Sequence, residues 1–503
     1  MLVKNLLPVT FLSAILFSIL FFRQDLGLNL LIFETSFVIL LFLTKQFKFS
    51  NRIQIACSVG FLLTAVFTVL THSTFSYIIH FITLIVYVGV LNYPSVKSII
   101  SATLISIISI FQSQIEFFRS ISNSKVKGKS LGKFIWKFRI FIIPSTIIFV
   151  FVAIYRASNP IFDKLTVNLG MVFQNVLDFI FKDIEILLVL IFLLGLFISN
   201  IFLFRTKNPS IENEDAKASD VLIRNRKKNY RSFATLSLKN ELKAALFLIF
   251  ILNAILLLLN ITDIYLVWFN FEWDGQTLKQ FVHEGTYFLI FSILISIAIV
   301  LYFFRGNINF YKSNKWLKKL SYLWLFQNAI LAISVGVRNY WYIEYFSLAY
   351  KRIGVAIFLI LTLYGLYSVF MKIRFVKSGF FLFRTNALAL YIILVLSSTI
   401  NWDTLIAKYN FAHADKAFLH FDYLADLSNK SLPYLDKPIS ELIEIENIQK
   451  EKFAYETDFM NAKEYHQHIE FKKSAFKKDW ESKGFLSWNL PEYRAYNKLF
   501  KNK

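Results

Sequence analysis

The stretch AALFLIFILNAILLLLNITDIYLVW, residues 244–268, decides the fold class of this chain. An α-helix needs about 20 consecutive apolar residues to cross the hydrocarbon core of a bilayer, which is roughly 30 Å thick. The stretch is long enough, but it also carries Asn253, Asn260 and Asp263. Because polar side chains are costly in hydrocarbon, these residues indicate a helix in the interior of a bundle or a functional site.

Comparable apolar runs recur as far as Trp402 in a chain of 503 residues that is 56% hydrophobic. We therefore predict an all-α fold, a polytopic transmembrane helix bundle of about 11–12 spans. The predicted spans are 6–22, 27–44, 53–70, 75–93, 97–115, 139–156, 184–204, 244–268, 284–304, 320–340, 352–372 and 385–402. The first five are short and crowded, so two of them could form one broken hairpin.

Three domains follow from this division of the chain. The N-terminal membrane spans occupy residues 1–138, and the core transmembrane bundle occupies 139–402 and includes a basic loop at 205–243. Residues 403–503 form a small helical tail, which we expect to dock on the membrane part because no Gly-rich or Ser-rich linker precedes it. Within the tail, Pro438 could begin a long charged helix that continues to about Lys483.

The net charge of +22 comes from the membrane part, because the tail holds 16 basic and 16 acidic residues. Two sets of alternating loops differ strongly in charge, since one set carries 26 Lys and Arg residues and the other carries seven. The richer set is 112–139, 205–243, 305–319 and 372–384, and the poorer set is 156–183, 269–283 and 338–352. Cytoplasmic loops are enriched in Lys and Arg, so the richer set should be cytoplasmic and the tail extracytoplasmic.

The same count leaves the side of the N-terminus open. The basic loop 45–52 would fall outside, against the rule, if all five early spans crossed the membrane. The loop charges explain the basic composition without nucleic-acid binding, so no nucleic-acid partner is predicted.

Two segments between the spans suggest contact with lipid. From Pro160 to Asp183, apolar and polar residues follow helical spacing, which predicts a helix on the outer membrane surface or one packed against the bundle. The basic run from Arg224 to Arg231 could attract anionic lipid headgroups or simply set the topology. The lipid bilayer is the predicted partner, and protein partners stay unknown.

The polar residues of the spans between 244 and 372 form the candidate site. Asn253 and Asn260 share a helix face, and Asp263 lies one turn further toward the outer end. The neighbouring spans add His283, Glu284, Gln327, Asn328, Arg338, Glu344 and Arg352. Two interpretations stay open: a polar cavity that binds an ion, a solute or a lipid headgroup, or a set of ion pairs and hydrogen bonds that pins the helix ends.

A second polar group lies at the inner end of the same region, in a turn that contains Arg305, Asn307 and Asn309. Asn and Gly favour turns held by side-chain-to-backbone hydrogen bonds, so we expect a structural role for this turn. The sequence contains no phosphate-binding loop, dinucleotide fingerprint or nucleophile elbow, and it predicts no metal and no cofactor.

Several motifs of this region occur in a fixed order. They are Asn260-Ile-Thr-Asp263, His283-Glu-Gly-Thr-Tyr, Arg305-Gly-Asn-Ile-Asn, Gln327-Asn328, Arg338-Asn339 and Tyr350-Lys-Arg-Ile-Gly354. With them, residues 240–435 resemble an uncharacterised family of bacterial multi-pass membrane proteins that is classed as a domain of unknown function. The resemblance is weaker over the N-terminal third and the far tail. It implies a bacterial cytoplasmic (inner) membrane, but no activity, ligand or catalytic residue.

Because no catalytic motif is present, we expect a non-enzymatic accessory or sensing component of that membrane. One alternative is a transporter or channel for a small solute or ion, with a polar cavity among the spans 244–372. The absence of an internal repeat and of paired broken spans counts against it. The other alternative is a membrane enzyme that acts on a lipid-linked substrate at the outer leaflet, with Asp263 or Glu284 beside Arg338.

Overall fold

The computed structural model describes residues 6–43, 51–123, 125–126, 129–130, 144–145, 147–148, 151–152, 154–167, 171, 185–224, 233–271, 275–453 and 460–501. Side chains are described for these residues except 125–126, 129–130, 233–237 and 275–284. Half of the predicted span 139–156, and most of the predicted surface helix 160–183 and of the basic run 224–231, lie outside the described residues.

Helices dominate the described part of the chain, which confirms the all-α prediction. The apolar helices are α1 (Leu6–Phe21), α2 (Leu28–Leu43), α3 (Arg52–Thr71), α4 (Thr74–Asn92), α5 (Ile99–Asn123), α8 (Ile186–Leu203), α10 (Phe233–Asp263), α11 (Gly275–Phe303), α12 (Lys315–Phe346), α13 (Tyr350–Arg374) and α14 (Gly379–Ser398). Every predicted span except 139–156 coincides with one of them. A two-residue strand pair, β1 (Lys125–Val126) and β2 (Lys129–Ser130), follows α5.

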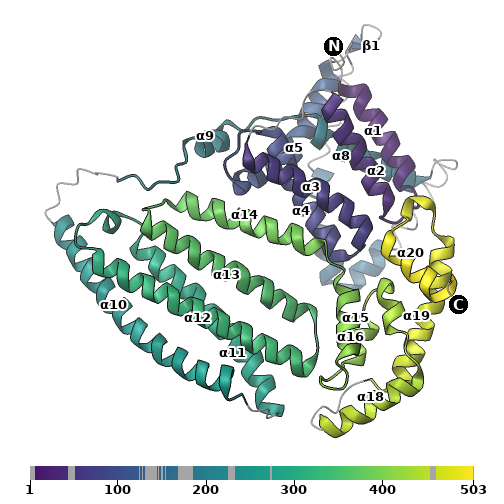
Figure 1. The fold of residues 1–503 in the computed structure, drawn as a ribbon. Helices are drawn as coiled ribbons and strands as arrows, with labels where there is room; N and C mark the ends of the chain where they lie inside the picture. The colour runs from purple at the N-terminus through teal and green to yellow at the C-terminus, as the bar shows by residue number, and fades with distance from the viewer. Residues whose placement is uncertain are drawn as a thin grey trace.

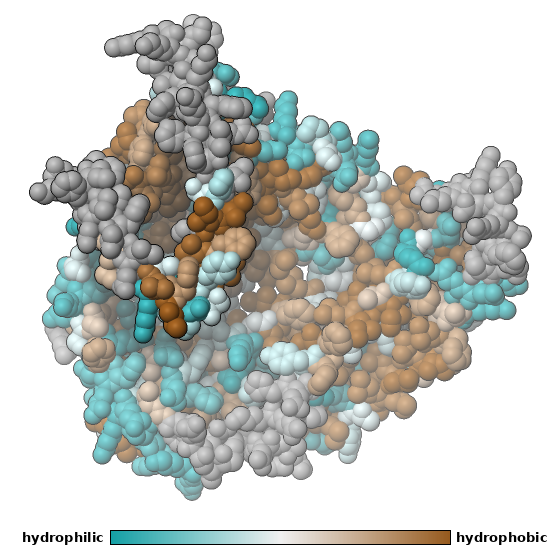
Figure 2. All heavy atoms as spheres, turned by 180° about the vertical axis from the view of Figure 1, so that it is seen from behind, coloured by the Kyte–Doolittle hydropathy of each residue, from teal (hydrophilic) through white to brown (hydrophobic). Residues whose placement is uncertain are grey.

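Among the described residues, nine helices are long and apolar enough to cross a membrane, and α1 and α2 are shorter apolar helices. Their outward faces are as apolar as their buried ones: Phe247 is 72% exposed and Leu258 is 67% exposed on α10. Figure 2 shows wide hydrophobic surface over the membrane helices and hydrophilic surface over the C-terminal lobe. A helix that is hydrophobic all round is stable in lipid, so the chain is a multi-pass membrane protein.

The membrane helices form two bundles that α14 joins. In the first bundle α1 packs on α8, and α4 packs on α3 and α5; in the second, α12 packs on α10, α11 and α13. Figure 1 shows α14 between the two groups, where it contacts α13 on one side and α3, α4 and α5 on the other. The Tyr391 hydroxyl donates to the carbonyl of Cys57 at 3.0 Å, and Gly60 leaves room for it, because a Cβ atom there would lie 2.3 Å from that hydroxyl.

Loops of both bundles gather at one end of the molecule. The side-chain amide of Asn51 donates to the carbonyl of Val96 at 2.7 Å, and the backbone N–H of Lys97 donates to Asp215 in α9 (Pro209–Lys217) at 2.7 Å. The segment after α9 pairs with the α13–α14 turn, where the N–H of Ser378 donates to the carbonyl of Asp220 at 2.9 Å. Described parts of the basic loops 45–52, 205–243 and 372–384 therefore lie at the same end.

Helix α5 is long enough to cross a membrane, but both of its halves lie toward this basic end. Ser109 accepts a hydrogen bond from Thr206 at 2.8 Å, and two turns later the ring of Phe117 meets Phe204 edge-on at 5.7 Å. Thr206 and Phe204 directly follow α8, so α5 runs along the end of the bundle over these turns. Four helices precede α5, and this arrangement brings Asn51 of the 45–52 loop to the same end as the other basic loops, which removes the conflict in the charge count.

The C-terminal lobe covers the opposite end of both bundles (Figure 1). It contains α15 (Trp402–Ala412), α16 (Phe421–Ala425), η3 (Asn429–Ser431), α17 (Leu432–Leu435), α18 (Ile439–Lys452), α19 (Ala462–Ser482), η4 (Phe485–Ser487), α20 (Leu490–Tyr496) and η5 (Asn497–Lys501). Phe421, Leu432 and Tyr465 belong to its own hydrophobic core. The N–H of Leu28, after the α1–α2 turn, donates to the carbonyl of Trp488 at 3.0 Å, so the lobe is joined to the first bundle.

The prediction of one long helix from Pro438 to Lys483 is wrong. Helix α18 ends at Lys452, and α19 begins at Ala462. Asn461 caps the second helix: its side chain accepts from the N–H of Glu464 at 2.9 Å, and the Glu464 carboxylate accepts from the N–H of Asn461 at 3.2 Å. This reciprocal capping box is a start signal for a helix, and it divides the charged stretch in two.

Candidate functional site

The predicted polar residues of α10 and α12 face each other across the interface of these two helices. The side-chain amide of Asn253 donates to the carbonyl of Leu320 at 3.2 Å, and that of Asn260 donates to the carbonyl of Gln327 at 3.1 Å. Donor and acceptor both advance by seven residues, which requires parallel helices with matched turns. Gln327 closes the ladder by donating to Asn253 at 2.9 Å. These contacts hold α10 and α12 in one register.

The lobe end of the same interface contains a buried ion pair between Asp263 and Arg338. Their side chains are 4% and 6% exposed, and Asp263 also accepts a hydrogen bond from Ser334. Helix α10 changes to a π-helix, η1 (Ile264–Phe269), directly after this carboxylate. Helix α11 packs close to the pair, because a Cβ atom at Gly285 would lie 3.4 Å from a guanidinium nitrogen of Arg338. Breaking such a pair is expensive in hydrocarbon, so the pair stabilises the packing of α10 on α12.

Arg352 caps the C-terminus of α12. Its guanidinium donates to the carbonyls of Phe346 and Ser347 and lies over the ring of Tyr342 at 4.4 Å. Ser347 has a φ of 66°, a left-handed backbone conformation that ends the helix abruptly. The last carbonyls of a helix carry partial negative charge, so an arginine here stabilises the α12–α13 turn.

This turn and the lobe enclose a cavity of about 350 Å³. The bundle contributes Lys351 and Arg352, and the lobe contributes Asn410, His420 and Tyr423. Two hydrogen bonds hold the walls together: the N–H of Leu348 donates to Asn410 at 2.7 Å, and the N–H of Tyr350 donates to the Tyr423 hydroxyl at 3.0 Å. Lys351 and Arg352 also line a second hollow of about 30 Å³, together with Thr286, Tyr287, Asn339, Tyr342 and Val355.

The remaining predicted residues are distributed over the same bundle. The amide of Asn328 donates within its own helix, to the carbonyl of Trp324 at 2.8 Å. Glu344 lies on α12, partly exposed, and forms no ion pair with a described residue. His283 and Glu284 belong to α11, but their side chains lie outside the described part of the structure. The prediction that these residues form a site therefore stays a prediction, whereas Asp263, Ser334 and Arg338 are in contact.

The inner turn lies at the basic end of the second bundle. Arg305 pairs with Glu241 of α10 at 3.3 Å, and Asn309 donates to the carbonyls of Phe304 and Gly306, each at 2.8 Å. The short helix η2 (Asn307–Phe310) forms the turn itself. Side-chain-to-backbone hydrogen bonds of this kind support the structural role expected for the turn.

The buried pair of Glu34 and His80 in the first bundle was missed by the sequence reasoning. The Nε2 atom of His80 on α4 lies 2.7 Å from the carboxylate of Glu34 on α2, and the side chains are 0% and 5% exposed. Each residue is an ionisable group in the middle of a predicted span, a signal that the sequence does contain. Their pairing was invisible because 46 residues separate them.

A second buried ion pair joins the lobe to the bundles, and sequence reasoning missed it too. Lys430, whose side chain is 1% exposed, lies 3.2 Å from Asp403 and donates to the carbonyls of Thr71 and His72 at 3.0 and 3.1 Å. Asp403 also accepts from the Tyr350 hydroxyl at 2.6 Å. Burial acts to raise the pKa of Asp403. Lys430 and the hydroxyls of Ser428 and Tyr350 together hold that pKa below its usual value.

His72 lies in the α3–α4 turn beside Glu492 of the lobe, with 3.8 Å between the imidazole and the carboxylate. Glu492 also accepts from Lys483 at 2.9 Å and from Asn489 at 2.8 Å. Burial lowers the pKa of His72, although the Glu492 carboxylate acts in the opposite direction. The imidazole is therefore harder to protonate when the lobe is docked.

Acidification should consequently weaken the docked state. Because the folded pKa of His72 is below the unfolded value of about 6.5, its contribution is complete above that pH and is lost as the pH falls toward the folded pKa. We expect the midpoint of thermal unfolding to drop between about pH 7.5 and about pH 5.5, and to drop less in His72→Gln. The matched control is His468→Gln on the exposed face of α19, which should behave as wild type. If the unfolding midpoint of His72→Gln dropped as much as that of the wild type, His72 would not be the group responsible.

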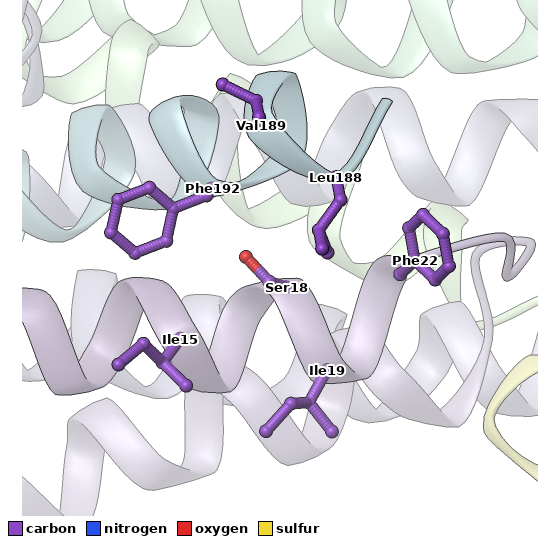
Figure 3. Close-up of a pocket in the computed structure, with 7 residues that line it drawn as sticks. All are labelled: Ile15, Ser18, Ile19, Phe22, Leu188, Val189 and Phe192. Carbon is purple, nitrogen blue, oxygen red and sulfur yellow. The ribbon is translucent and has the colours of Figure 1, made fainter. Parts of the chain in front are cut away.

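A different hollow, of about 550 Å³, lies on the side of the first bundle between α1 and α8. Figure 3 shows its lining: the hydroxyl of Ser18 points from α1 toward Leu188 and Phe192 of α8, and Ile15 and Ile19 lie along α1. That hydroxyl already donates to the carbonyl of Ala14 at 3.0 Å. Apart from Ser18, the residues that line this groove are apolar.

Comparison with known families places most of the chain in one of them. The family described as a domain of unknown function (DUF4153) matches residues 11–437. This match extends far beyond the 240–435 resemblance: it takes in the first bundle and ends directly before α18. No curated protein and no solved structure matches the chain significantly.

Proposed function

Because the chain belongs to the DUF4153 family, whose function is unknown, we propose from its geometry that it is a non-enzymatic sensing component of the bacterial cytoplasmic membrane. The observation that carries this proposal is the cavity of about 350 Å³ between the α12–α13 turn and the lobe. A ligand held there contacts bundle and lobe at once. Its binding energy would therefore favour the docked lobe over an undocked one.

The chemistry of the cavity favours an anionic ligand. Lys351 and Arg352 line it from the bundle, at the point where α13 enters the membrane, and His420 lines it from the lobe. Lysine and arginine bind phosphate and carboxylate groups through charge-assisted hydrogen bonds. A cavity at the membrane surface with this lining fits the headgroup of an anionic lipid, and we propose that class of ligand.

The test measures thermal unfolding of the purified full-length protein in neutral detergent with added phosphatidylglycerol or phosphatidylcholine. Phosphatidylglycerol should raise the unfolding midpoint of the wild type, and Lys351→Met should lose more than half of that shift. Lys416→Met, an exposed lysine of the lobe, is the matched control and should keep the shift. An undiminished shift in Lys351→Met would refute the cavity as the binding site.

Two further experiments distinguish lipid binding from the binding of a free anion and from transport. If inorganic phosphate alone gives a shift that Lys351→Met abolishes, the ligand is a free anion and not a lipid headgroup. If reconstituted vesicles take up labelled phosphate and Lys351→Met stops the uptake, the protein is a transporter and the sensing proposal fails. None of the three cavities described above is lined by Asn253, Asn260 or Gln327, so no solute path is proposed through them.

We also propose that the lobe faces the outside of the cell. The support is the gathering of the basic loops at the end of the bundles opposite the lobe, because Lys-rich and Arg-rich loops stay in the cytoplasm. A reporter enzyme that is active only outside the cytoplasm should be active when fused after Lys503 and inactive when fused in the 205–243 loop. The reverse pattern would overturn the orientation.

A further inference from the structure

The Glu34–His80 pair lies deep inside the first bundle. Glu34 is six residues from the start of α2 and His80 is six residues from the start of α4, and both starts are at the lobe end. At 1.5 Å per residue, both groups lie roughly 9 Å along their helices from that end. An ionisable pair at this depth is costly and by default indicates a function.

The charged groups on the elements around the pair are distant or already paired. Helices α1 and α8 contain no ionisable side chain, and the other ionisable groups of α3 and α4 are Arg52, Cys57, Tyr77 and Tyr87. Arg52 and Arg205 lie at the basic end, while His72 lies at the lobe end beside Glu492.

On α5, Glu116 and Arg119 pair with each other, and on α14, Arg384 pairs with Asp220. Tyr391 of α14 donates to the carbonyl of Cys57. Among the described residues, these charged groups of the neighbouring helices therefore pair elsewhere or lie at the ends of the bundle, away from Glu34 and His80.

Both nitrogens of the His80 ring have partners. Nε2 lies 2.7 Å from Glu34, and Nδ1 lies 3.1 Å from the hydroxyl of Thr64 on α3. The Thr64 hydroxyl is also 2.7 Å from the hydroxyl of Thr83 and 3.0 Å from the carbonyl of Phe61. The ring of Phe61 stacks on the imidazole at 5.7 Å. The imidazole is thus fixed between a carboxylate and a hydroxyl.

The site satisfies His80 in two protonation states. In the imidazolium, Nδ1–H donates to the Thr64 oxygen, and the Thr64 hydroxyl donates to the carbonyl of Phe61. In the neutral ring, the Thr64 hydroxyl rotates and donates to Nδ1 instead. The second carboxylate oxygen of Glu34, Oε2, is buried and has no hydrogen-bond partner among the described residues. The pair can therefore gain or lose a proton without moving a helix.

Three buried threonines of α3 lie between the pair and the lobe. Thr64, Thr68 and Thr71 follow each other on one face of the helix, and the hydroxyls of Thr68 and Thr71 donate to the carbonyls of Ala65 and Phe67 at 2.6 and 2.7 Å. The carbonyl of Thr71 accepts a hydrogen bond from the ammonium group of Lys430, at the junction with the lobe.

We propose that Glu34, His80 and Thr64 form a proton-binding site inside the membrane that exchanges one proton with the lobe side of the protein. In the uptake step, a proton from water on that side adds to Nδ1 of neutral His80. The site then changes from a carboxylate with a neutral imidazole to a carboxylate with an imidazolium, so its charge rises by one.

The test is nitrogen NMR of the full-length protein in lipid nanodiscs, labelled at histidine nitrogens and titrated from about pH 5 to about pH 9. His80→Gln identifies the His80 signal. In the wild type this signal should change between the imidazolium and neutral forms within the range. Glu34→Gln, which removes the charge and keeps an acceptor for Nε2–H, should shift the midpoint to lower pH by at least one unit.

Two more variants keep the proposal falsifiable. Glu116→Gln is the matched control, a partly exposed glutamate on α5, and should leave the midpoint of the His80 titration unchanged. Thr64→Val keeps the pair and removes the Nδ1 partner, so it should lower the midpoint by roughly one pH unit even if Glu34→Gln fails to fold. A His80 signal that does not titrate in the wild type, or that titrates identically in Glu34→Gln or in Thr64→Val, would overturn the proposal.

Discussion

Replacing Lys430 with methionine should detach the lobe from the membrane bundles. The substitution leaves Asp403 buried with hydroxyl partners alone, and it removes the donor to the carbonyls of Thr71 and His72. Breaking a buried ion pair by removing one partner typically costs about 3–5 kcal/mol. We expect a loss of that size in the stability of the docked state, because Lys430 is the contact that joins α3, α15 and η3.

Limited proteolysis of the protein in nanodiscs measures this loss. In Lys430→Met the lobe should be cleaved much faster than in the wild type, at sites that the docked lobe protects, while the bundles stay intact. Lys437→Met is the matched control, since Lys437 forms a half-exposed pair with Glu441, and surface pairs contribute about 0–1 kcal/mol. Replacing both members of the pair, as Lys430→Met with Asp403→Leu, should restore much of the protection. Equal cleavage of Lys430→Met and wild type would refute the role of the pair.

The membrane helices could be predicted from the sequence because the information for them is local. A run of apolar residues long enough to cross the bilayer forms a helix wherever it occurs, and predicted and observed helices coincide for this reason. The polar stripe of α10 was visible in the same way, from the seven-residue spacing of Asn253 and Asn260. Its partner carbonyls on α12 follow from the parallel register, which the spacing alone does not specify.

The pairs between distant segments could not be predicted. Nothing local connects Glu34 with His80 or Thr71 with Lys430, since these contacts depend on which helices become neighbours. The orientation of α5 could not be predicted for the same reason. The helix is long and apolar enough to cross a membrane, and only the contacts of Ser109 and Phe117 show its course. An ionisable residue within a predicted span is itself a signal of a buried partner, and Glu34 and His80 carry this signal as clearly as Asp263 does.

The ion pair of Asp263 and Arg338 gives the second large effect. Asp263→Asn and Arg338→Gln each leave one member of a buried pair with weaker partners, and Arg338→Gln also leaves Ser334 bonded to an unpaired carboxylate. Each substitution should lower the stability of the second bundle by about 3–5 kcal/mol. Thermal unfolding in detergent and the amount of protein in the membrane both measure this loss. Arg305→Gln, which breaks the exposed pair with Glu241, is the control and should cost little.

The double variant Asp263→Leu with Arg338→Met separates the two interpretations of the cluster. If the pair only pins the ends of α10 and α12, the apolar replacement should recover stability and cellular function together, because a buried ion pair is seldom better than well-packed apolar side chains. If the charges themselves act on an ion or a headgroup, the double variant should recover stability and remain without function. The contacts of Asp263 with Ser334 and Arg338 leave the carboxylate fully engaged inside the interface. We therefore expect the first outcome, in which stability and function return together.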